Sequence, residues 1–76
     1  MKKLYKWLCE QFPQYEIKVT KDDIYCDSSD LQIYVGKFIS PYVGYLGHCH
    51  YKDKKCNFKC TSQQSVINNI KNALEV

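Results

Sequence analysis

The chain has 76 residues, and its 11 lysines against 8 acidic residues give a formal net charge of +3. This length suits one domain over residues 1–76, and 45% hydrophobic with 25% charged residues is typical of a globular protein, which excludes a disordered chain. Every basic side chain is a lysine, so arginine, the usual residue for bidentate recognition of phosphate or guanine, is missing.

The hydropathy pattern and the interrupted N-terminal segment predict a cytoplasmic protein. No run approaches the roughly 20 apolar residues of a membrane span. The N-terminal lysines resemble the start of a secretory signal, but Lys6, Glu10 and Gln11 interrupt any apolar run and no small-residue cleavage site follows. We therefore expect the cysteines to stay reduced thiols, as is usual in a reducing compartment.

Residues 2–12 are predicted to form the first helix. Leu4, Leu8 and Phe12 recur at every fourth position and form one apolar stripe. Pro13 ends the helix, because proline has no backbone N–H to continue it.

Strict alternation predicts a strand over residues 15–20, whose inward side chains are Tyr15, Ile17 and Val19. A tight turn at Lys21-Asp22 or at Asp22-Asp23 leads into a returning strand at residues 24–26. Tyr25 points outward there, and Ile24 and Cys26 point inward.

Residues 27–30, Asp-Ser-Ser-Asp, form a turn because their short polar side chains bond their own backbone. A third strand follows over residues 31–38, with Leu31, Ile33 and Val35 inward. Its outward residues are Gln32 and Tyr34. Ser40-Pro41 breaks this strand, since proline cannot donate to a central ladder.

Residues 42–60 predict a hairpin with a two-residue turn at Asp53-Lys54. That turn pairs Tyr51 with Cys56, Cys49 with Phe58 and Gly47 with Cys60. Alternation then places one set of side chains on the inward face: Tyr45, Cys49, Tyr51, Cys56, Phe58 and Cys60. The opposite face carries His48, His50, Asn57 and Lys59.

The C-terminal segment predicts an amphipathic helix that opens with a Thr61–Gln64 capping box. Its apolar stripe consists of Val66, Ile67, Ile70, Ala73 and Leu74.

The elements follow the order α-β-β-β-β-β-α, which predicts an α+β fold with an antiparallel sheet of four to five strands. Helices on opposite faces would bury Tyr25 and Tyr34. The outward strand positions are too polar to lie under a helix, so we expect both helices on one face, in a two-layer sandwich.

The motif His48-Cys49-His50, followed by Cys56 and Cys60, suggests a zinc site by residue type. Strand neighbours point to opposite faces, however, so the histidines and cysteines cannot share one metal ion or form a catalytic pair. We expect Cys26, Cys49, Cys56 and Cys60 to be unmetallated thiols, with no cofactor and no enzymatic activity. The acidic residues form no pair suited to acid–base catalysis, and no glycine-rich phosphate loop is present.

A lysine cluster at Lys52, Lys54, Lys55 and Lys59 makes nucleic acid an alternative partner. The helix–strands–helix order resembles the double-stranded-RNA-binding domain. That family grips phosphates with lysines at the start of its second helix, whereas residues 61–65 here carry no positive charge.

Protein binding is the favoured function. Tyr25 and Tyr34 are expected on the solvent face of the sheet, bordered by the acids Asp22, Asp23, Asp27 and Asp30. Tyrosine offers a large contact area at low entropic cost, as interface centres require. In size, lysine usage and lack of a catalytic motif, the chain resembles the small proteins with which bacteriophages block host defence, such as anti-CRISPR proteins. The resemblance implies an inhibitor that occupies a larger host protein or nucleoprotein complex.

Overall fold

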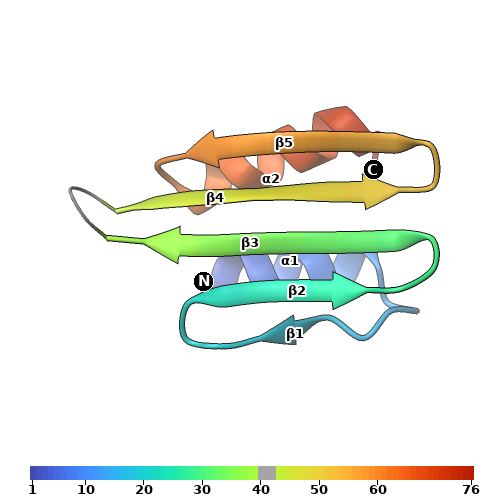
Figure 1. Cartoon of the computed structure of the whole chain (residues 1–76), viewed down its shortest axis with the longest axis horizontal. Coiled ribbons are helices and arrows are strands. Elements are labelled where there is room, and N and C mark those ends of the chain that lie inside the picture. Colours follow the sequence, from blue (N-terminus) through green and yellow to red (C-terminus); the bar gives the residue numbers. More distant parts are fainter. Residues whose placement is uncertain (40–42) are drawn as a thin grey trace.

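The computed structural model describes residues 1–39 and 43–76. The chain forms an N-terminal helix, then a five-stranded antiparallel sheet, then a C-terminal helix (Figure 1). The elements are α1 (Lys2–Gln11), β1 (Lys18–Val19), β2 (Asp23–Asp27), β3 (Leu31–Phe38), β4 (Gly44–Tyr51), β5 (Lys54–Cys60) and α2 (Gln63–Leu74). The strands lie in sequence order, each antiparallel to the next. The predicted α+β class and element order are confirmed. The predicted break at Ser40-Pro41 lies outside the described residues.

Both helices lie on the same side of the sheet, so the molecule has two layers (Figure 1). Leu4 and Leu8 of α1 share one core with Ile70 of α2, and all three are fully buried. The sheet contributes the inward residues Ile24, Cys26, Leu31, Ile33, Val35, Cys49 and Phe58 to the same core. Burying each large apolar side chain stabilises the fold by about 1.5–3 kcal/mol. Neither helix of the described chain is long and apolar enough to cross a membrane.

The N-cap of α2 differs from the prediction by one residue. The Ser62 hydroxyl, not Thr61, accepts a hydrogen bond from the backbone N–H of Ser65 at 3.1 Å. Gln64 does not complete a capping box and instead donates to Asn68 at 3.0 Å. Ser62 holds the extended backbone that precedes a helix, with φ −141° and ψ 156°, and both serine and threonine are good caps. The sequence alone therefore did not separate the two positions.

The β4–β5 turn is Lys52-Asp53, and the predicted turn at Asp53-Lys54 is wrong. Tyr51 pairs with Lys54, whereas Cys49 pairs with Cys56, Gly47 with Phe58 and Tyr45 with Cys60. Lys52 adopts the left-handed conformation, with φ 58°, and its backbone N–H donates to the Asp30 carbonyl at 3.0 Å. The pairing shifts by two residues, so every side chain keeps its predicted face.

The first strand is shorter than predicted, because only Lys18 and Val19 pair with β2. Val19 pairs with Ile24 and so lies on the predicted face, yet it is 44% exposed. The reason is its place at the sheet edge, since α1 lies behind β2 and β3 and not behind β1 (Figure 1). The turn is Lys21-Asp22, because the Thr20 N–H donates to the Asp23 carbonyl at 2.8 Å.

Candidate binding face

The side of the sheet that faces away from the helices, here called the outer face, is open. One row of its side chains runs in register across all five strands: Lys18, Tyr25, Tyr34, His48 and Asn57. Tyr25 and Tyr34 stand next to each other in this row and are 40% and 41% exposed. Both tyrosines thus point outward, as the alternation predicts.

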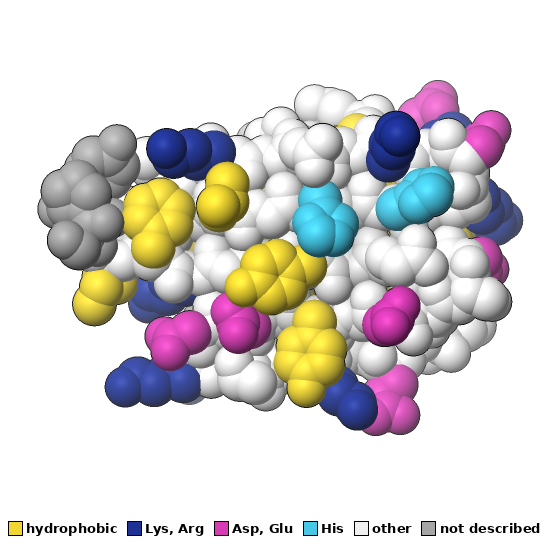
Figure 2. All heavy atoms as spheres, in the orientation of Figure 1, with side chains coloured by type: hydrophobic (Ala, Val, Ile, Leu, Met, Phe, Trp, Pro, Cys, Tyr) yellow, Lys and Arg dark blue, Asp and Glu magenta, His cyan; other side chains and the backbone are white. Residues whose placement is uncertain are grey.

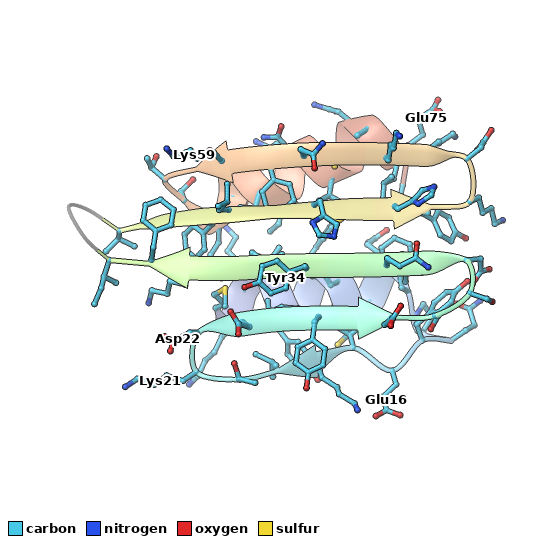
Figure 3. The ribbon with its side chains drawn as sticks, in the orientation of Figure 1. Glu16, Lys21, Asp22, Tyr34, Lys59 and Glu75 are labelled. Carbon is cyan, nitrogen blue, oxygen red and sulfur yellow. The ribbon has the colours of Figure 1, made fainter. Side chains whose placement is uncertain are left out.

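Tyr34 is held in a defined orientation at the centre of this face (Figure 3). Its ring lies over Gly36, where an added Cβ would approach the Tyr34 Oη to 2.8 Å. The hydroxyl donates to the Asp23 Oδ1 at 3.1 Å, and this hydrogen bond raises the pKa of Tyr34. On its other side the ring tilts against His48, with 6.1 Å between ring centroids. An aromatic side chain fixed in this way loses little entropy when a partner covers it.

Two shallow hollows flank Tyr34. The larger, about 620 Å³, lies over β3, β4 and β5, and the smaller, about 220 Å³, lies toward Phe38. Leu46 borders both hollows and is 53% exposed. Leu46 was not among the predicted site residues, although the signal was present, since alternation from Tyr45 puts Leu46 on the outer face.

The four predicted acids do not form one group. Asp23 and Asp27 lie on the outer face of β2, and Asp22 lies in the neighbouring turn. Asp30 lies apart, because its carboxylate accepts a hydrogen bond of 2.8 Å from the Tyr15 hydroxyl. That bond raises the pKa of Tyr15 to about 12. Three acids therefore border the tyrosines, with Lys18 and Lys21 beyond them at the edge of the sheet.

The four lysines of the alternative basic patch are also divided. Lys55 and Lys59 project from the outer face of β5. Lys54 projects to the other side and forms an ion pair of 2.6 Å with Glu75 at the end of α2. The Lys52 ammonium lies 5.1 Å from the centroid of the Tyr51 ring. Lys55 and Lys59 are thus the two of these four lysines that project from the outer face.

The outer face consequently has charges of different sign on either side of its apolar centre. Figure 2 shows apolar and aromatic side chains across the middle of this face, with acids on the β2 side and lysines at the borders. The acidic border is Asp22, Asp23 and Asp27, and the basic border on β5 is Lys55 and Lys59. A partner surface that fits this face needs complementary charges on either side of an apolar centre.

The histidines and cysteines lie on opposite faces of β4 and β5. His48 and His50 are exposed, whereas Cys49 is 1% exposed. Cys49 lies opposite Cys56 in the strand register, on the core side, and both are free thiols. Within residues 1–39 and 43–76, no group of three or more His, Cys, Asp and Glu side chains is placed to hold a metal ion. Burial raises the pKa of the Cys49, Cys56 and Cys60 thiols, which makes them weak nucleophiles at neutral pH.

Comparisons with models of protein families, with curated proteins and with solved structures found no match to this chain.

Proposed function

We propose that this chain is a non-enzymatic binding protein of the cytoplasm, which uses its outer face to cover a surface on a larger protein or nucleoprotein. The observation that carries the proposal is the cluster of large exposed side chains at the centre of that face. Tyr25, Tyr34 and Leu46 are 40%, 41% and 53% exposed. Tyrosines near the centre of an interface are frequent hot spots.

The charge borders support a nucleoprotein partner of the kind that phage inhibitors block. Asp22, Asp23 and Asp27 form an acidic border that complements the basic channel of a nucleic-acid-binding protein. The small size and the lysine-only basic side chains agree with the resemblance to anti-CRISPR proteins. We therefore propose inhibition of a host defence complex as the biological role.

The alternative, a double-stranded-RNA-binding module, has less support on the outer face. Non-specific binding needs several phosphate contacts, and Lys54 is already paired with Glu75. Lys55 and Lys59 alone remain on this face from the predicted cluster.

A pull-down from bacterial lysate, with and without nuclease, tests the proposal. The tagged chain should recover a protein partner that persists after nuclease treatment. Tyr34→Ala should then weaken binding to that partner by about 30-fold or more, as expected for a hot spot. Lys54→Ala is the matched control, because Lys54 lies on the helix side, and it should leave affinity unchanged.

Two results would contradict the proposal. In the first, nuclease removes every recovered partner, which makes nucleic acid the ligand. In the second, Lys54→Ala weakens binding of a nuclease-resistant partner as much as Tyr34→Ala does.

A further inference from the structure

The helix layer carries a groove that the proposed function does not use. It lies between α1 and α2 and has a volume of about 400 Å³. Lys3, Lys6 and Trp7 line it from α1, and Ile67 and Lys71 line it from α2. Among the residues that the structure describes, none from a strand lines the groove, so it opens on the opposite side of the molecule from the outer face.

The two walls of the groove are fixed relative to each other. The helices run in the same direction behind the sheet (Figure 1), and their apolar stripes join one core. The backbone N–H of Leu4 donates to the side-chain Oε1 of Gln63 at 2.9 Å, which ties the start of α1 to the start of α2. Ile67 is 5% exposed, and Trp7 packs partly against the core. The groove is therefore present before any ligand binds.

The groove is positively charged and rich in hydrogen-bond donors. Its three lysines and the single acid Glu10 leave a net charge of +2. Among the described residues the ion pairs are Lys18–Glu16 and Lys54–Glu75, so none of the groove lysines takes part in one. The parallel helices also bring both positive dipole ends to the Lys3 end of the groove.

We propose that this groove binds the phosphate backbone of a single-stranded nucleic acid, with Trp7 as the surface on which one base stacks. Lysine ammonium groups bind phosphates as point charges, and base–aromatic stacking does not depend on sequence. Exposed helix lysines are often only solvated. Here three lysines from two helices line the same groove as an indole ring, and single-strand binding surfaces combine positive charge with an aromatic side chain in this way. The site is independent of the outer face.

Trp7 is the only tryptophan in the chain, so its fluorescence reports on the groove directly. Titration with a short oligothymidylate at low salt should quench this fluorescence to saturation. Three phosphate contacts on a single strand predict that log K falls with log[salt] with a slope of about −2. Lys3→Gln, Lys6→Gln and Lys71→Gln should each make that slope shallower by about 0.7. Glu10→Gln should strengthen binding, because it removes the one negative charge among the described residues that line the groove.

Lys55→Gln and Lys59→Gln are the matched controls, since they remove the same charge from the opposite side of the molecule. They and Tyr34→Ala should leave the titration unchanged, which separates this proposal from the outer-face proposal. The far-ultraviolet circular dichroism of each variant verifies that the chain is folded.

Three outcomes would overturn the inference. The first is that the Trp7 fluorescence does not change with oligothymidylate. The second is that Lys55→Gln weakens binding as much as Lys6→Gln does. The third is that polyglutamate quenches Trp7 and displaces the oligonucleotide at equal charge concentration, which would identify the groove as a site for acidic protein segments.

Discussion

The inner and outer faces of the sheet are built from the same strands but differ in almost every physical property. In β3, Leu31 and Val35 are fully buried under the helices, whereas Tyr34, between them in sequence, is 41% exposed. In β4, Cys49 is 1% exposed and Leu46 is 53% exposed. A shift of one residue along a strand therefore separates a core position from a binding position.

This difference means that stability and binding can be changed separately. The inner face is packed on both helices, so removing atoms there leaves cavities. Among residues 1–39 and 43–76, neither helix packs on the outer face, so we expect its side chains to add little to folding. We expect substitutions on the inner face to alter the free energy of unfolding, and substitutions on the outer face to alter partner affinity.

The largest contrast is expected from one substitution made on both faces. Leu31→Ala should lower the free energy of unfolding by about 2–5 kcal/mol, because it opens a cavity in the core. Leu46→Ala should change the free energy of unfolding by less than about 0.5 kcal/mol. Urea denaturation followed by circular dichroism measures both values. Similar losses for the two variants would mean that the outer face is also packed.

The assignment of residues to the two faces could be predicted from sequence because it depends only on alternation. The turn at Lys52-Asp53 was predicted one residue too late, yet the pairing shifted by two and no side chain changed face. The turn position itself depends on a tertiary contact, the bond from the Lys52 N–H to the Asp30 carbonyl. No local pattern contains that contact.

The candidate site was predictable where it depends on alternation and not where it depends on tertiary contacts. The outward positions of Tyr25 and Tyr34 follow from alternation, and so does that of Leu46, which was not among the predicted site residues. The separation of Asp30 was not predictable, because its partner Tyr15 is distant in sequence. The position of Lys54 was missed because the predicted turn included it, whereas Lys54 is a β5 residue on the same side as Cys56 and pairs there with Glu75. The groove between the helices depends on the relative direction of α1 and α2, which only the assembled sheet determines.

A second contrast comes from two glycines on opposite faces. An added Cβ at Gly47 would lie 1.9 Å from the backbone oxygen of Tyr34, so β3 and β4 would have to separate. Gly47→Ala should therefore lower the free energy of unfolding by about 1–3 kcal/mol or more. At Gly36 an added Cβ would meet the end of the Tyr34 side chain, which can move.

Gly36→Ala should thus leave stability nearly unchanged while it displaces Tyr34 from Asp23 and weakens partner binding. Urea midpoints and affinities of the two variants test this directly. Equal destabilisation by both alanines would show that Tyr34 is as immobile as the backbone.

The third contrast uses two neighbours in sequence, Cys49 on the inner face and His48 on the outer. Cys49→Ser should lower the free energy of unfolding by about 1–3 kcal/mol, because it buries a hydroxyl in an apolar site. His48→Ser should have a much smaller effect, since the His48 ring is exposed. A larger loss for His48→Ser would place the strand one residue out of register.

Cys49 also predicts the smallest effect, a loss of stability at alkaline pH. Burial raises the pKa of the Cys49 thiol, so above the ordinary thiol pKa of about 8.5 the unfolded chain releases this proton while the folded chain keeps it. The folded state then binds more protons than the unfolded state, and the free energy of unfolding falls as pH rises. For one thiol the fall cannot exceed about 1.4 kcal/mol per pH unit.

Denaturation from pH 8 to pH 10 should therefore show a steeper decline in the free energy of unfolding for the natural chain than for Cys49→Ala. Below pH 8 the difference in stability between the two chains should be constant. Parallel declines above pH 8 would mean that the Cys49 thiol ionises in the folded protein as readily as in the unfolded chain.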